Sequence, residues 1–486
     1  MKNVSISWKM ALPLLAILLS SVFTSCSDDD KKMSDLTGFL SFGFSDESLA
    51  NYEFTIGSDN VITNQIALPY GFDASALTPT FSTAPLAMVN IAGVDFVSGT
   101  SAIDFTEDVV FTVVAEDGDN TLNYTVRVNV ASTLSAWTNL SPNAGLPLYT
   151  DISAFEIGGK FFVVGGLKGG LYGGHESGLF SSTDGASFTA VSTSIFHDYG
   201  IAIGSTPVKH GDNQLLIGGC SYADYDDNGL NGANSANQKV WSSTDGITWE
   251  KLTVTETDPA KAVWGMYPEI NSFSARSHAA VANMNGDLYL VGGFGYFYGS
   301  PQVAIADAWK STDGGVTWTN LEANFGDGFV ARANSQLLVY KDELYLIGGR
   351  NQYLGSPQMY YNEIYKSADG TNWTKVDVVT PFDAVAGHTC YVYNDRMILI
   401  GGNADTGEVD ENENQIVAPS NAMWVSEDAG VNWTKVAEGG LPEGFAGRAG
   451  HGLVKDGNKV HVFGGMGVET DGSTKVLTDS WEGTLN

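Results

Sequence analysis

Cysteines, basic residues and long hydrophobic runs are scarce in this chain of 486 residues. Only three cysteines are present, which excludes a fold held together by a disulfide framework. Lysine and arginine number 24 against 56 acidic residues, which gives a formal net charge of −32. Because nucleic-acid binding relies on clustered cations that neutralise phosphates, this balance argues against a nucleic-acid partner. Such acidity is typical of a protein kept soluble by its own charge.

The one long apolar run lies near the N-terminus. Lys2 and Lys9 precede an apolar stretch over residues 10–23, and Thr24-Ser25-Cys26 follows it. This order predicts a signal peptide, residues 1–25, that ends in a lipobox-like site with lipidation at Cys26. A plain signal peptide or a membrane anchor is the alternative, although the stretch is short for a spanning helix. Since no other segment is long and apolar enough to cross a bilayer, we expect the lipid to be the only membrane attachment.

An acidic tether, residues 26–35, begins Cys-Ser-Asp-Asp-Asp-Lys-Lys. It resembles the export tag that sends lipoproteins of Bacteroidota to the outer face of the outer membrane. That resemblance implies an outer-membrane lipoprotein exposed at the cell surface, and a periplasm-facing anchor is the alternative.

Residues 36–131 alternate polar and apolar side chains and contain no glycine pair. The β-rich runs 109–115 and 124–130, separated by Glu-Asp-Gly-Asp-Asn, predict a hairpin. With shorter runs upstream, the segment predicts an immunoglobulin-like β-sandwich of about 95 residues. It resembles the all-β spacer domains of surface lipoproteins, which implies a stalk. Glycan binding by this domain is the alternative.

A repeat runs through residues 132–486. Six times, a short apolar run ends in a glycine pair. The pairs are Gly165-Gly166, Gly218-Gly219, Gly292-Gly293, Gly348-Gly349, Gly401-Gly402 and Gly464-Gly465. Five repeats also carry a Ser-x-Asp turn sequence between two aromatic residues. Because strands and tight turns recur with a period of about 50 to 70 residues, the sequence predicts an all-β propeller with four strands in each repeat.

The two ends of the repeat region complement each other. The last repeat stops after a third strand around Trp481, whereas Ser-Ala-Trp-Thr-Asn-Leu at residues 135–140 matches the fourth strands of the other repeats. We therefore expect this N-terminal strand to complete the last blade and to close a ring of six blades. Closure would remove the exposed edges that an open sheet leaves.

The glycine pairs and the aromatic residues that follow them resemble those of kelch-type propellers. The Ser-x-Asp boxes resemble the Asp-boxes of sialidase-like propellers, and residues 311–318 and 426–433 match the longer form of that box. The whole layout is similar to surface lipoproteins that place a β-sandwich before a kelch-like propeller. Because both propeller families include enzymes, lectins and scaffolds, the resemblance implies a fold rather than one activity.

Candidate ligand-binding residues lie on the face where the strand two to three loops and the connections into strand one open. Three arginines lead into strand one, and a histidine stands close behind several of these turns. These residues are Arg276, Arg332, Arg448, His278, His388 and His451. Around the mouth of a channel, guanidinium groups would suit a carboxylate or sulfate. The alternative is that the arginines fasten neighbouring blades, as the kelch resemblance implies.

Aromatic side chains on the same face suit sugars, whose C–H faces stack on rings while their hydroxyls take directed hydrogen bonds. They are Tyr296, Tyr298, Tyr353 and Trp264. Loop aromatics folded back on themselves are the alternative.

Calcium is the one cofactor that the sequence suggests. Asp224, Asp226 and Asn228 match the opening of an oxygen-ligand calcium loop, but Ser235 stands where a bidentate glutamate is expected. A second acidic loop spans residues 405–413, and solvated carboxylates are the alternative there.

Together these features predict a non-catalytic surface lipoprotein that binds a glycan, or a protein partner, through the loop face of its propeller. One alternative is an enzyme similar to the six-bladed sialic-acid epimerases of the kelch type. That resemblance implies an arginine on the substrate carboxylate, with Glu269 or His278 carrying a proton. The other alternative is a protein-docking scaffold.

Overall fold

The computed structural model describes residues 33–131, 134–146, 149–165, 167–168, 178–192, 204–222, 234–236, 239–252, 273–295, 303–352, 357–436, 440–468 and 473–486. These residues form an all-β protein, whose one helical element among them is the 3-10 turn Glu47–Leu49. The chain divides into two compact units, residues 1–66 with 73–129 and residues 67–72 with 130–486. Within the described part, no helix has the length and apolarity needed to span a membrane.

The first unit contains a six-stranded sheet and a two-stranded sheet. The larger sheet has the order β2 (Phe54–Ile56), β3 (Val61–Asn64), β8 (Thr121–Arg127), β7 (Val109–Val114), β5 (Met88–Ile91) and β6 (Val94–Asp95). The smaller sheet pairs β1 (Phe39–Phe44) with β4 (Pro79–Thr83). The two sheets share an aromatic core, in which Phe39 meets Phe111 and Tyr124 edge to face. Strands β7 and β8 form the expected antiparallel hairpin, whereas β3 and β8 run parallel.

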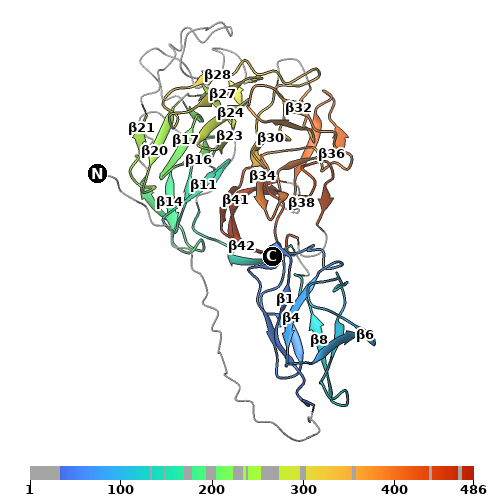
Figure 1. Cartoon of the computed structure of the whole chain (residues 1–486). Helices are drawn as coiled ribbons and strands as arrows, with labels where there is room; N and C mark the ends of the chain where they lie inside the picture. The colour runs from blue at the N-terminus through green and yellow to red at the C-terminus, as the bar shows by residue number, and fades with distance from the viewer. Residues whose placement is uncertain are drawn as a thin grey trace, which may run out of the picture. The chain divides into compact units, whose positions relative to one another are not determined.

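The second unit is a β-propeller built from six four-stranded sheets, numbered here as blades 1 to 6 in chain order (Figure 1). Blade 1 contains β11 (Ser153–Ile157), β12 (Lys160–Val164), β14 (Leu179–Ser182) and β15 (Thr189–Ser192). Blade 2 contains β16 (Thr206–His210), β17 (Asn213–Ile217), β20 (Val240–Ser243) and β21 (Glu250–Lys251). Blade 3 contains β23 (Ala280–Met284), β24 (Asp287–Val291), β27 (Ala308–Ser311) and β28 (Thr319–Asn320).

The other three blades have the same strand order. Blade 4 contains β29 (Gln336–Tyr340), β30 (Glu343–Ile347), β31 (Ile364–Ser367) and β32 (Thr374–Lys375). Blade 5 contains β34 (Thr389–Tyr393), β35 (Arg396–Ile400), β38 (Met423–Ser426) and β39 (Thr434–Lys435). Blade 6 contains β40 (Gly452–Asp456), β41 (Lys459–Val468), β42 (Thr474–Leu485) and β9 (Ser135–Ser141). Its outer strand β9 therefore comes from the start of the unit and pairs antiparallel with β42.

The glycine pairs hold neighbouring blades together. The second glycine of a pair donates its backbone N–H to the chain that leads into strand one of the next blade, as Gly293 does to Arg332 O at 3.1 Å and Gly402 does to Arg448 O at 2.8 Å. Gly401 has a φ of +65°, and a Cβ there would lie 2.7 Å from Arg448 O in the chain that leads into the next blade. Only glycine combines this backbone conformation with such close approach, so the pairs fix the spacing of the blades.

The Ser-x-Asp sequences form self-contained turns between the third and fourth strands. In blade 2, Asp245 Oδ1 accepts hydrogen bonds from the backbone N–H groups of Ile247 and Thr248 at 2.8 and 2.7 Å, and Ser243 Oγ accepts from Gly246 N at 2.9 Å. The backbone donors at Thr248 and Ile247 lower the pKa of Asp245 to about 2. These carboxylates are therefore occupied within their own turns.

A cavity of about 550 Å³ is lined by the innermost strand of every blade. Strands β11, β16, β23, β29, β34 and β40 are each the inner edge of their sheet. An edge strand presents unpaired backbone N–H and C=O groups, so polar backbone groups share the wall of this channel with apolar side chains such as Phe155, Val281 and Leu337.

Candidate functional site

One end of the channel is ringed by six residues at equivalent positions in the six blades, called the collar here. The collar residues are Asp151, Gly204, His278, Asn334, Gly387 and Gly450. All six have φ between +53° and +66°. Backbone hydrogen bonds link successive blades through them, from His278 N to Gly204 O at 2.6 Å and from Asn334 N to His278 O at 3.1 Å, for example. The collar is thus a fixed rim, because each backbone is held by its neighbours.

Only three collar residues carry side chains, and two of these lie over glycines. A Cβ on Gly204 would fall 2.4 Å from His278 Cε1, and a Cβ on Gly450 would fall 2.5 Å from Asp151 Oδ1. The glycines therefore make room for an imidazole and a carboxylate on the rim. The third side chain, Asn334, has a buried Oδ1 that accepts no hydrogen bond from the described residues.

Arg350 lies beside the collar at the start of the strand two to three loop of blade 4. Its backbone is held by hydrogen bonds in both directions with Ala333, each 3.0 Å. The guanidinium Nη1 donates to Gln352 Oε1 at 2.9 Å, and Cζ lies 4.5 Å from the centre of the Phe294 ring. Phe294 is fully buried and also meets the His278 ring, with 5.9 Å between ring centroids. One aromatic side chain therefore positions both Arg350 and His278.

Arg350 differs from the other arginines in having no acidic partner. The chain has six arginines, all of them within the described residues. Five form an ion pair with an Asp or Glu, and Arg350 forms none with any described residue. A guanidinium without a carboxylate partner among the described residues is a candidate for binding one on a ligand.

The charges around Arg350 are coupled. Burial lowers the pKa of the Arg350 guanidinium, and the nearby Tyr360 and Asp151 oppose that shift. Burial also lowers the pKa of His278, with Asp151 acting to raise it and Arg350 to lower it. The site therefore combines a cation, a neutral imidazole and a carboxylate within electrostatic range of one another.

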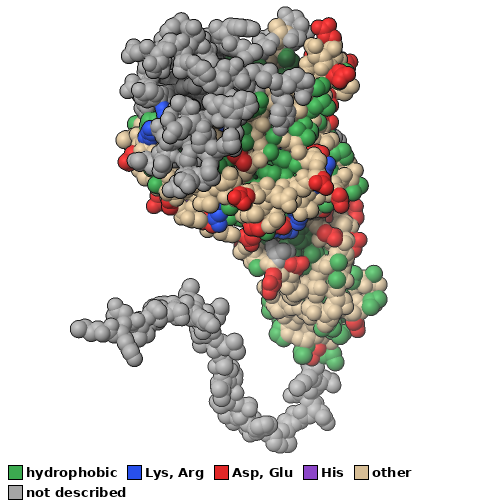
Figure 2. Space-filling model, turned by 90° about the horizontal axis from the view of Figure 1, so that it is seen from above, with side chains coloured by type: hydrophobic (Ala, Val, Ile, Leu, Met, Phe, Trp, Pro, Cys, Tyr) green, Lys and Arg blue, Asp and Glu red, His purple; other side chains and the backbone are tan. Residues whose placement is uncertain are grey.

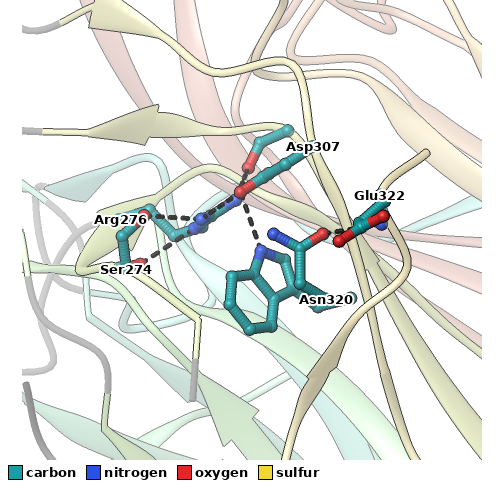
Figure 3. A network of polar contacts seen from close by, with 7 residues as sticks. Ser274, Arg276, Asp307, Asn320 and Glu322 are labelled. Atoms are coloured by element: carbon teal, nitrogen blue, oxygen red, sulfur yellow. Dashed lines mark hydrogen bonds and ion pairs between the residues drawn. The ribbon is translucent and has the colours of Figure 1, made fainter. Parts of the chain in front are cut away.

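Arg276, expected at the channel mouth, is instead fully buried inside blade 3. Its Nη1 and Nη2 donate to the two carboxylate oxygens of Asp307 at 2.5 and 2.8 Å, and Nη1 also donates to Gly292 O at 2.9 Å. Figure 3 shows Asp307 between this guanidinium and an indole, which belongs to Trp309 and donates to Asp307 Oδ2 at 2.7 Å. The donors of Arg276 are thus used within its own blade.

The same arrangement recurs in blades 4 and 6. Arg332 pairs with Glu363 at 2.8 Å, and Arg448 pairs with Asp479 at 2.9 Å. In all three blades the acid follows the arginine by 31 residues. Blade 5 has Val385 and Ala422 at these two positions, so arginine and acid are absent together. Ligand binding by Arg276, Arg332 and Arg448 stays a prediction, and this pairing favours the alternative role in holding the blades.

His388 and His451 lie at blade interfaces and also line the channel. The His388 ring packs against Gly348 of blade 4, and neither of its nitrogens has a hydrogen-bond partner in the described part of the chain. His451 Nε2 lies 2.8 Å from Thr389 Oγ1. Burial lowers the pKa of both histidines to about 3. Both rings are therefore neutral near pH 7.

Several predicted residues lie outside the described part of the chain. These are Cys26, Asp224, Asp226, Asn228, Trp264, Glu269, Tyr296, Tyr298 and Tyr353. The second acidic loop is described and belongs to a hairpin of β36 (Asn403–Val409) and β37 (Gln415–Pro419). Asp410 accepts hydrogen bonds there from Asn412 and Asn414. The described residues contain no group of three or more side chains placed to hold a metal ion.

Arg350, Asp151 and Asn334 were not among the residues predicted from the sequence. Arg350 directly follows a glycine pair, and the other five residues at this position are uncharged: Leu167, Cys220, Phe294, Asn403 and Met466. A single charge at an otherwise uncharged repeat position was therefore a readable signal. Asp151 and Asn334 align with His278 in the repeat, but the structure is needed to show that they share one rim.

Comparisons with known proteins agree with the repeat architecture. Residues 25–128 match the N-terminal domain of DUF6242, a domain of unknown function. The kelch repeat protein M-T8 of Myxoma virus (strain Lausanne) is 26% identical over 213 residues, which cover 44% of this chain and 36% of that protein. The N-acetylneuraminate epimerase of Salmonella enteritidis PT4 (strain P125109) is 36% identical over 77 residues, or 15% of this chain and 20% of the enzyme. The kelch relatives support a propeller of the kelch type.

The structure of YjhT aligns with a TM-score of 0.49 and 17% sequence identity, covering 70% of this chain and 96% of that chain. The chain spans about a third or less of the length of the two curated relatives named above, since it matches 36% of one and 20% of the other.

Proposed function

We propose that this protein binds a carboxylate-bearing glycan at the collar end of its propeller channel, without catalysing a reaction. The observation that carries the proposal is Arg350, the one arginine of the described chain with no acidic partner. It lies beside a polar rim that offers Asp151, His278 and Asn334 to the same ligand.

The chemistry of these groups suits a sugar acid. A guanidinium binds a carboxylate through two parallel hydrogen bonds, and only Nη1 of Arg350 has a described hydrogen-bond partner. The hydroxyls of the sugar would donate to Asp151 and to Asn334 Oδ1, which accepts no hydrogen bond from the described residues, since both groups are acceptors. Because the collar backbone is fixed by hydrogen bonds, the site is preorganised for this binding.

The proposal includes the setting of the site. We infer a closed six-bladed ring, supported by the pairing of β9 with β42 in blade 6. We also infer that the first unit is an immunoglobulin-like spacer, and that lipidation at Cys26 anchors the protein to the outer membrane with the propeller at the cell surface. The N-terminal sequence and the two-sheet core of the first unit support this arrangement.

A glycan array tests the binding directly. A soluble form lacking residues 1–26 would be applied to sialylated, uronic-acid and neutral glycans, together with its Arg350→Ala variant. We expect binding to carboxylate-bearing glycans that Arg350→Ala abolishes. The matched control is Arg127→Ala, which removes an exposed arginine from the first unit. Silence across the array would refute the proposal and favour a protein-docking scaffold.

A second candidate function is the epimerisation of a sugar acid. Two observations favour it: the similarity of 77 residues to an N-acetylneuraminate epimerase, and a carboxylate and an imidazole on one rim, at Asp151 and His278. A neutral imidazole accepts a proton as a general base, and the imidazolium that forms, stabilised by the neighbouring Asp151 carboxylate, can return that proton. Proton NMR of anomeric exchange in sialic acid, with and without the protein, decides this case. An exchange rate equal to the buffer rate would exclude the activity.

A further inference from the structure

We infer that Asp151 makes the collar site selective for sugars with one negative charge, such as uronic acids, over sugars with two, such as sugar phosphates. This inference rests on the proposed function, because it assigns the ligand class of the same site. It goes beyond Arg350, which alone would favour the more strongly charged ligand.

The geometry places an unpaired carboxylate where the ligand must sit. Asp151 lines the cavity together with His278 and Asn334. Its carboxylate makes no ion pair or hydrogen bond with the described residues, although Arg350 and His278 both lie within electrostatic range. Since Asp151 Oδ1 lies over Gly450, which has no side chain, the carboxylate rests on the rim itself.

An unpaired carboxylate discriminates between ligands in two ways. It accepts a hydrogen bond from a sugar hydroxyl, which stabilises a neutral part of the ligand. It also repels any negative charge beyond the one that Arg350 neutralises, and charges this close interact strongly at a partly buried site. The site therefore contains both an attractive element for a hydroxylated acid and a repulsive one against a dianion.

The surroundings of the site strengthen this repulsion. Strand β36 of blade 5 starts directly after Gly401-Gly402, as Arg350 does after Gly348-Gly349 in blade 4, so the acidic hairpin rises on the same side of the ring. Its exposed acids are Glu408, Asp410, Glu411 and Glu413. On the face shown in Figure 2, Asp and Glu side chains outnumber Lys and Arg side chains among the described residues. A dianion would approach against this field.

Glucuronate and glucose 6-phosphate provide a matched pair of probes. Both are hexoses with the anionic group at the sixth carbon, and at pH 7.5 they carry about one and about two negative charges. Calorimetric titration of the soluble form would give both affinities for the wild type, Asp151→Asn and Arg350→Ala. Asparagine keeps the shape of aspartate and tolerates the left-handed backbone at this position, so the variant should fold.

The control is Asp342→Asn, which removes an equal charge from the exposed turn between β29 and β30, outside the collar. We expect the wild type and the control to bind glucuronate more tightly than glucose 6-phosphate. In Asp151→Asn the ratio of these two affinities should fall about tenfold. An unchanged preference in Asp151→Asn, with glucuronate binding that still depends on Arg350, would overturn this inference alone. If the wild type binds no carboxylate-bearing glycan on the array and neither glucuronate nor glucose 6-phosphate in solution, both the proposed function and this inference are overturned.

Discussion

The Arg448 guanidinium meets the Asp479 carboxylate in a fork of two hydrogen bonds, each 2.9 Å long. The arginine is fully buried and also donates to Gly464 O at 3.0 Å. On its other side the carboxylate accepts the indole N–H of Trp481 at 2.6 Å. One acid therefore ties the chain leading into strand one to the third strand of blade 6.

Removing only Asp479 should destabilise the protein severely. Asp479→Ala leaves a buried guanidinium without its counter-charge, and we expect a loss of about 3–5 kcal/mol in the free energy of unfolding. Arg448→Val combined with Asp479→Ala reproduces the pair that blade 5 carries at Val385 and Ala422, so it should recover much of that loss. Urea unfolding of the single and double variants measures both effects. If the losses in free energy of unfolding caused by the two substitutions simply add, the two residues are not coupled. If a stable double variant no longer binds the glycan, Arg448 is a ligand-binding residue after all.

The glycine pairs should tolerate no side chain, because another blade lies against them. Gly401→Ala puts a methyl group against Arg448 O and His451 of the next blade and strains a backbone at φ +65°, so we expect a loss of about 3 kcal/mol or more in the free energy of unfolding. Gly407→Ala is the matched control, since its φ is +82° but nothing lies within 4 Å of a Cβ there. The control should lose about 1 kcal/mol. Equal losses of unfolding free energy in the two variants would mean that contact with the neighbouring blade does not contribute to the cost of the substitution.

The interface histidines should make the protein sensitive to acid. His388 and His451 have pKa values of about 3 when folded, whereas an unfolded histidine titrates near pH 6.5. Between these values the unfolded chain binds more protons, so stability falls as the pH is lowered from about 6.5 towards 3. Each histidine should contribute up to about 1.4 kcal/mol per pH unit. Urea midpoints from pH 7.5 to 4.5 should show a shallower slope for His388→Gln than for the wild type, and parallel slopes would contradict this origin.

Strand β9 should be essential to the second unit. Deleting residues 134–140 exposes the edge of β42 and uncovers the cluster around Trp481, so we expect the melting temperature to fall by on the order of 10 °C. The control is a deletion of equal length at residues 27–33, which precede the first strand. It should leave the melting temperature unchanged. An unchanged melt after the first deletion would refute closure of the ring by β9.

The sequence predicted the repeated scaffold well because the scaffold depends on local signals. The glycine pairs, the Ser-x-Asp turns and the alternating strands each lie within a few residues, and those in the described part of the chain appear where expected. The segment 135–140 could also be assigned to the last blade, since it matched the missing fourth strand by sequence alone.

The candidate site was harder to predict because it depends on contacts between distant residues. Arg276 looked like a channel residue until Asp307, 31 residues later, was seen to neutralise it. The recurrence of that spacing at Arg332 and Arg448 was visible in the sequence and would have indicated paired charges. That Arg350 lies within range of Asp151 is different, because these residues belong to blades 4 and 1 and no local pattern connects them.

The contact that a glycine pair makes with the next blade involves the glycine backbone and not the side chain of the residue that follows. Leucine, cysteine, phenylalanine, arginine, asparagine and methionine occupy the six positions in this chain. Phe294 is buried in a core cluster with Ala304, Ala331 and Ala333, but the other five positions vary in chemical character while the glycine contacts beside them are kept. A single substitution at a position after a glycine pair could therefore give the propeller a new ligand specificity without a change of fold.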